Sequence, residues 1–132
     1  MPIKFSIDRE NQVLRSIFVG EISDSDQLQA YKALFAGEDW VPGYPEIVDL
    51  TRADMSKTTS HGLKEVSIIC AKAFSRHGIT FCPTAVVAPE DLQFGIARMY
   101  SGLTGESPES VKVFRNELEA LDWINQIRPP AD

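Results

Sequence analysis

Few residues of this chain are suited to catalysis, and they form no known catalytic pattern. Nucleophilic catalysis usually pairs a nucleophile with a His that acts as its base, and the only candidates are His61 and His77. His77 closes a predicted helix beside cations, a position that the negative end of the helix dipole explains. No Ser and Asp pattern accompanies His61. We therefore expect no catalytic residue.

Carboxylates and cysteines also give no indication of an active site. Paired carboxylates such as Asp24 and Asp26 fall in predicted loops or helix caps, where we expect them to be solvated. Cys70 and Cys82 have neither a CxxC partner nor a His at zinc spacing, so we interpret both as small buried hydrophobic residues. The chain has no glycine-rich phosphate loop. The sequence thus predicts a protein that is not an enzyme, with no cofactor and no metal.

Arg98 is the basic residue whose neighbours suggest a ligand. It follows Ile96 and precedes Met99, so we expect it at the edge of the apolar face of a helix. One interpretation is an Arg whose stem covers apolar surface while its head stays in water. The other is a guanidinium that holds a carboxylate or phosphate head group beside Phe94 or Tyr100. Phe94, Arg98 and Tyr100 are therefore the ligand-binding candidates.

The elements that position these residues follow from hydrophobic periodicity. Alternating apolar residues predict strands at 3–7 and 13–19, joined by a polar turn into an antiparallel hairpin. Short apolar runs predict three more strands, and apolar residues at helical spacing predict four helices. The expected ranges are strands at 46–51, 84–88 and 110–114, and helices at about 24–37, 58–77, 90–103 and 116–127.

These elements predict the fold class. Strands separated by single helices should run parallel, with right-handed crossovers. Together with the hairpin they predict an α/β fold with a mixed, mostly parallel sheet packed with four helices. In the last two helices the spacing predicts which residues face inward: Leu92, Ile96, Met99 and Leu103 from one, and Leu118, Leu121, Ile124 and either Trp123 or Ile127 from the other.

Composition limits the partners and the compartment. The 132 residues fit one domain spanning 1–132, and 13 basic against 19 acidic residues give a net charge of −6. That charge repels phosphate backbones, so we expect no nucleic-acid partner. No stretch approaches the ~20 apolar residues of a membrane span, and residues 1–6 lack a signal-peptide pattern. We expect a cytoplasmic protein.

Two neighbouring stretches resemble a known family. Residues 47–51 (IVDLT) and 58–63 (TTSHGL) are similar to the sulfate-transporter and anti-sigma-antagonist (STAS) superfamily, where an apolar strand ends in Asp-Leu-Ser and a loop leads to Asp-Ser-Ser-Gly-Leu at a helix start. Residues 94–100 and 113–124 resemble its SpoIIAA-like subgroup. Its members are small, stand-alone bacterial proteins of poorly defined function, sometimes grouped with the CRAL-TRIO lipid-carrier fold.

The resemblance implies a role for the turn before the second predicted helix. In anti-sigma antagonists a serine of this turn is phosphorylated, which switches partner binding. The matching residues here are Thr58, Thr59 and Ser60, but the family's Asp is replaced and His61 is inserted before Gly62. Two roles stay open: the hydroxyls cap the helix, or the helix N-terminus favours a phosphoryl group or bound anion there.

Two functions follow as hypotheses. The first is a non-enzymatic regulatory or protein-interaction module, whose partner is another protein or a second copy in a homodimer. The alternative is a carrier or sensor of a small apolar or lipid-like ligand, held between the helix at 90–103 and the sheet. In that case Phe94, Met99, Tyr100 and Trp40 would line or cover the ligand.

Overall fold

The computed structural model describes residues 2–128, so Met1 and residues 129–132, the two ends of the predicted domain range, lie outside it. The element order confirms the predicted β-β-α-β-α-β-α-β-α arrangement. None of the described helices is long and apolar enough to cross a membrane. The elements are β1 (Ile3–Asp8), β2 (Val13–Glu21), α1 (Asp24–Ala36), β3 (Glu46–Asp54), α2 (Ser60–Arg76), β4 (Cys82–Val87), α3 (Asp91–Thr104), β5 (Glu109–Phe114) and α4 (Glu117–Ile127).

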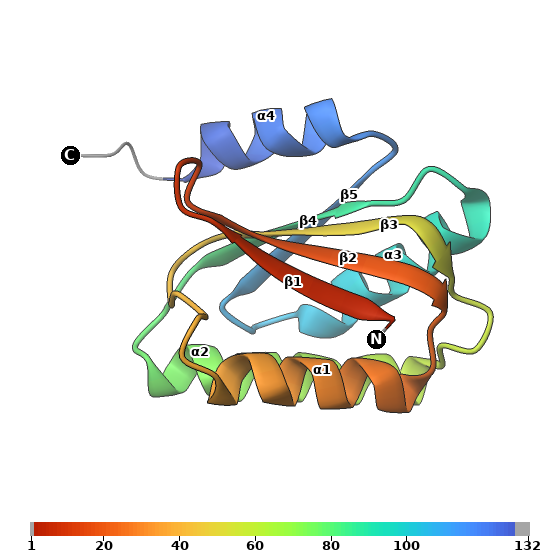
Figure 1. Ribbon diagram of the computed structural model, residues 1–132, viewed down its shortest axis with the longest axis horizontal. Coiled ribbons are helices and arrows are strands. Elements are labelled where there is room, and N and C mark those ends of the chain that lie inside the picture. Colours follow the sequence, from red (N-terminus) through yellow and green to blue (C-terminus); the bar gives the residue numbers. More distant parts are fainter. Residues whose placement is uncertain (1, 129–132) are drawn as a thin grey trace.

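The five strands form one mixed sheet, which confirms the predicted fold class. Their spatial order is β1-β2-β3-β4-β5. β1 pairs with β2 antiparallel, and every later pair is parallel. Helices α1, α2 and α3 pack side by side on one face, and α4 covers the other (Figure 1).

Because both faces are covered, the central strands are buried on both sides. All six residues of β4 are buried. Side chains along a strand point alternately to opposite faces, so Val86 joins the core under α1–α3 while Ala85 and Val87 join the core under α4. The side of the sheet that a residue faces therefore follows from its position in the strand.

Helix α3 turns a different face to the core than predicted. Leu92, Met99 and Leu103 are 53%, 41% and 36% exposed, so the expectation that they face inward is wrong. The buried residues are Gln93, Ala97 and Thr104. The amide of Gln93 donates to the carbonyl oxygens of Leu50 and Ala53 at 2.6 and 2.9 Å, which fixes the rotation of the helix.

Helix α4 also differs from the prediction at one position. Leu118 is 75% exposed, whereas Ile124 is fully buried as expected. Leu121 and Trp123 are partly buried against the same core. Ala120 lies one turn before Ile124 and is fully buried too. A small residue at this position lets the helix approach the sheet closely, and this places Leu118 on the outer face.

Candidate functional site

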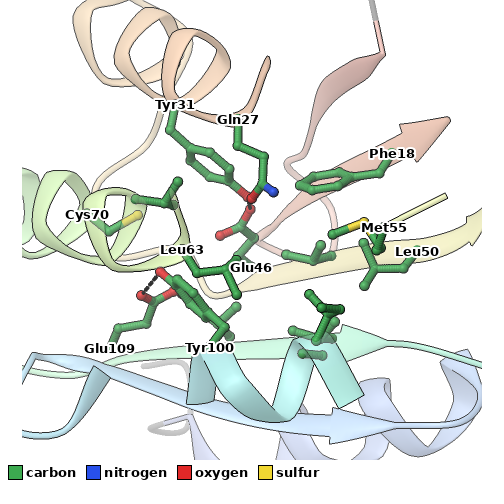
Figure 2. Close-up of a pocket in the computed structure, with 16 residues that line it drawn as sticks. Phe18, Gln27, Tyr31, Glu46, Leu50, Met55, Leu63, Cys70, Tyr100 and Glu109 are labelled. Carbon is green, nitrogen blue, oxygen red and sulfur yellow. Dashed lines mark hydrogen bonds between the residues drawn. The ribbon is translucent and has the colours of Figure 1, made fainter. Parts of the chain in front are cut away.

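A cavity lies between the sheet and helices α1, α2 and α3. Its volume is about 50 Å³, measured as the space open to the centre of a water molecule. Figure 2 shows side chains converging on it from all three helices and from the strands. Most of the wall is apolar. The polar residues of the wall, apart from the thiol of Cys70, are Gln27, Tyr31, Glu46, Thr84, Tyr100 and Glu109.

The sheet register brings two glutamates to this cavity. Glu46 is the first residue of β3 and Glu109 is the first of β5. On the intervening β4, Thr84 pairs with Glu46, while Cys82, two residues earlier, pairs with Glu109. Residues two apart in a strand share a face. All four side chains therefore point to the α1–α3 side, and the carboxylates flank Thr84.

Glu46 is held by two hydroxyl groups. It is only 6% exposed, and its Oε2 accepts hydrogen bonds from Ser16 Oγ at 2.5 Å and Tyr31 Oη at 2.6 Å. Tyr31 reaches Glu46 from α1 (Figure 2). Burial raises the pKa of the Glu46 carboxyl, although the two hydrogen bonds act in the opposite direction.

Glu109 is held in the same manner from the other side. Its Oε1 accepts from Tyr100 Oη at 2.7 Å, drawn as a dashed line in Figure 2, and its Oε2 accepts from Thr84 Oγ1 at 2.9 Å. Burial, with a smaller contribution from the negative charge of Glu46, raises the pKa of Glu109 to about 7, although the hydrogen bonds from Tyr100 and Thr84 act in the opposite direction. Near neutral pH this carboxyl is therefore divided between its charged and neutral forms.

The groups that could attack a substrate are not activated at the cavity. Burial and the charges of Glu109 and Glu46 raise the pKa of the Cys70 thiol, so it stays protonated. Neither His lines the cavity. His61 is exposed and pairs with Glu65, whose Oε1 lies 2.8 Å from its Nε2. Within residues 2–128, no three His, Cys, Asp or Glu side chains gather as a metal site would require.

Thr58, Thr59 and Ser60, here called the hydroxyl turn, lie beyond the opposite end of β3, where α2 begins. Thr58 is buried; its hydroxyl donates to the carbonyl of Ile22 at 3.0 Å and accepts from Gln27 Nε2 at 3.3 Å. Thr59 is the N-cap of α2, and its hydroxyl accepts from the Gly62 amide at 3.1 Å. Ser60 is exposed, and among the described residues no hydrogen bond involves its side chain.

A carboxylate of the chain itself occupies this helix start. Asp24 accepts from the Thr59 amide at 2.9 Å and from the Thr59 hydroxyl at 2.5 Å. A Cβ atom on Gly62 would lie 2.1 Å from Asp24 Cγ, so only glycine fits here. The positive end of α2 is thus already neutralised by an acidic side chain from α1.

The three ligand-binding candidates are not brought together. Tyr100 lines the cavity. Phe94 lies outside it, with the Arg115 guanidinium 4.1 Å above its ring. Arg98 is exposed on the outer side of α3. Of the two other residues expected to cover a ligand, Met99 is exposed, and Trp40 is buried against Phe35, Phe74 and His77 rather than at the cavity.

Sequence reasoning missed the two glutamates. Glu46 precedes the apolar residues that begin β3, and Glu109 precedes those of β5, so both look like solvated flanking residues. The signal that could have found them is a carboxylate in step with the alternate residues of a buried strand that face the core. Glu46 is in step with Val48 and Leu50, which both belong to the core.

Comparison with known proteins establishes the fold. A crystal structure of an uncharacterized protein from the DUF3478 family with a SpoIIAA-like fold, from Shewanella loihica PV-4, matches with a TM-score of 0.55 and 22% sequence identity, over 92% of this chain and 91% of that chain. The chain has the SpoIIAA-like fold. The predicted resemblance is thereby confirmed at the level of architecture. No protein-family model and no curated protein matches the sequence.

Proposed function

We propose that this SpoIIAA-like protein is a non-enzymatic sensor module that holds a small molecule between its sheet and helices α1–α3. The observation that carries the proposal is the cavity itself. A mostly apolar pocket with a few convergent polar groups of perturbed pKa is the usual form of a small-molecule site. The carboxyls of Glu46 and Glu109 are those groups.

The chemistry of the wall supports binding rather than catalysis. Burial raises the pKa values of the Tyr31 and Tyr100 hydroxyls and of the Cys70 thiol, so these groups remain protonated. Neither imidazole is near enough to activate them. A site of this kind can hold and orient a ligand, but it has no base poised beside a nucleophile. The cytoplasm remains the proposed location, in keeping with two free, buried cysteines.

The size of the cavity limits the ligand. A water molecule needs ~10–15 Å³ of this kind of space, so 50 Å³ accommodates about three to five waters or a ligand of similar size. A lipid chain would require α1, α2 or α3 to move away from the sheet. The ligand proposed here is accordingly a small molecule with an apolar part.

Mass spectrometry and a cavity-filling variant test the proposal. Ala97 lines the cavity and is 4% exposed, so Ala97→Leu should fill it. Native mass spectrometry of gently purified wild-type protein should show a bound small molecule that Ala97→Leu lacks. Ala33→Leu adds the same side chain at an exposed position of α1 and should retain the ligand. An unliganded wild-type mass, with no thermal shift across a metabolite and lipid panel, would refute the proposal.

The exposed hydroxyl of Ser60 favours a second candidate, the protein-interaction module. Thr58 and Thr59 are engaged in hydrogen bonds that hold α1 against α2, so their modification would break those bonds. Ser60 stands free in the first turn of α2. A phosphoryl group there would lie one turn before Lys64, and it would place a second negative charge beside Asp24, the carboxylate that joins α1 to the start of α2.

A pull-down with phosphoproteomic mapping tests this second function. Ser60→Ala should abolish both modification and partner capture, while Ser56→Ala, an exposed serine of the same loop, should leave both unchanged. If a partner binds wild type and Ser60→Ala equally well, the turn is not the docking element. Ser60→Ala should fold normally, because no hydrogen bond of the described residues depends on its hydroxyl.

A further inference from the structure

The cavity contains a carboxylate oxygen that no protein group satisfies. Both hydrogen bonds to Glu46 end on Oε2, and within residues 2–128 no group donates to Oε1. The one fully enclosed side-chain atom without a partner in this part of the chain is Nε of Arg128. Glu46 Oε1 is therefore in contact with open space, and the cavity that Glu46 lines provides that space.

The negative charge at this site is also uncompensated. Among the described residues that line the cavity, none is Lys, Arg or His. The ion pairs of the described chain involve neither Glu46 nor Glu109. Each carboxylate accepts hydrogen bonds from two hydroxyl groups, but burying a carboxylate without a cationic partner is still costly. A proton or a bound cation would neutralise the charge and remove that cost.

We propose that the cavity is a binding site for a small organic cation, an ammonium group carried on a short apolar body. The inference rests on the proposed function, that the cavity holds a ligand, and adds its chemical class. An ammonium has three donors and no acceptor. It can donate to Glu46 Oε1 and to the second lone pairs of Glu109, while apolar side chains such as Leu63 and Ile96 surround the body.

Other ligand classes fit less well. An anion, including the carboxylate of a free amino acid, would face two glutamates and no cation. A metal ion would need three or four clustered protein ligands, and residues 2–128 offer no such group. A neutral alcohol could occupy the apolar part, but it would leave the charge of the glutamates uncompensated.

Binding of the cation is coupled to protons. The titratable groups that face the cavity from the packed elements are Tyr31 of α1, Glu46 of β3, Cys70 of α2, Tyr100 of α3 and Glu109 of β5, with Cys82 of β4 nearby. The tyrosines and thiols have raised pKa values and stay neutral. Glu109, with a pKa of about 7, exchanges its proton near neutral pH, so the bound cation replaces that proton.

Titration calorimetry with three probes of similar size tests this inference. n-Butylammonium, n-butanol and butyrate are each titrated into wild-type protein at pH 6 and pH 8. With the pKa of Glu109 at about 7, the Kd for butylammonium should fall about tenfold from pH 6 to pH 8. Glu46→Gln with Glu109→Gln should abolish this binding. Glu38→Gln with Glu106→Gln removes the same charge from exposed positions and should leave it intact.

The outcomes separate the two proposals. Saturable, pH-dependent binding of butylammonium that needs the buried glutamates supports the inference. Suppose instead that butanol or butyrate binds, that Ala97→Leu blocks this binding, and that butylammonium does not bind comparably. This result overturns the inference and leaves the proposed function standing. Equal binding of butylammonium to the buried double variant also overturns it. If none of the probes binds, and none appears in the cavity of soaked crystals, the inference falls, and the proposed function then depends on the native mass measurement.

Discussion

Replacing Glu109 by Gln should make the protein more stable, and by an amount that depends on pH. The pKa of Glu109 is about 7 in the folded protein, against an ordinary value of 4.5. Between these values the folded state binds more protons than the unfolded state. The free energy of unfolding of the wild type must therefore fall as pH rises from about 4.5 to about 7. That rise in pKa corresponds to about 3 kcal/mol.

Gln removes the charge but keeps the shape of the side chain. Its Oε1 can still accept from Tyr100, and Thr84 can rotate its hydroxyl to accept from the new amide. We therefore expect Glu109→Gln to exceed the wild type by only about 1 kcal/mol near pH 5 and by up to about 3 kcal/mol near pH 8. If removing the charge of Glu109 also lowers the pKa of Glu46, the stability difference becomes larger.

Urea denaturation followed by circular dichroism, at several pH values from 5 to 8.5, measures this difference. Urea is preferred to guanidinium, which is itself a small organic cation. Glu106→Gln removes one carboxylate from an exposed position of the preceding loop and controls for net charge. A constant difference between wild type and Glu109→Gln at all pH values would refute the reasoning. A variant less stable than wild type at pH 8 would refute it as well.

Two further predictions concern packing and thiol access. Gly62→Ala should destabilise the protein by about 1–3 kcal/mol, because the new Cβ would collide with Asp24. At Gly95 a Cβ meets nothing within 4 Å, so Gly95→Ala should raise the free energy of unfolding by up to about 1 kcal/mol. Urea denaturation measures both changes, and equal effects of the two variants would contradict the geometry. Cys70 and Cys82 are 2% and 3% exposed, so a chromogenic disulfide reagent should label them only as the protein unfolds. Rapid labelling of the native protein would contradict this.

The sequence predicted the element order and the mixed sheet because both depend on local signals. Hydrophobic period, cap residues and turn residues lie within each segment. The rotation of α3 depends on contacts between segments. Gln93 is a polar residue in an amphipathic helix, and nothing in the local pattern shows that the carbonyls of Leu50 and Ala53 receive its amide. The exposed apolar residues of α3 follow from that contact.

The candidate site was predicted only in part, for the same reason. Tyr100 was named from the sequence and lines the cavity, but its partner Glu109 was not. Pairing these residues with Glu46 and Tyr31 requires the register of β3, β4 and β5, which joins positions far apart in the chain. A carboxylate at the start of a strand looks solvated until the neighbouring helices are placed over it.

The cavity and the hydroxyl turn are connected through one side chain. Gln27 lines the cavity (Figure 2). Its amide donates to Thr58 Oγ1, and the Thr58 hydroxyl in turn donates to the carbonyl of Ile22 before α1. A ligand that draws the Gln27 amide toward Glu46 would weaken its bond to Thr58 at the start of α2. A free energy of coupling between the two sites requires a shared element with two arrangements, and Gln27 is the residue placed to have them. If it does, the ligand-binding and partner-binding proposals describe the input and the output of one sensor.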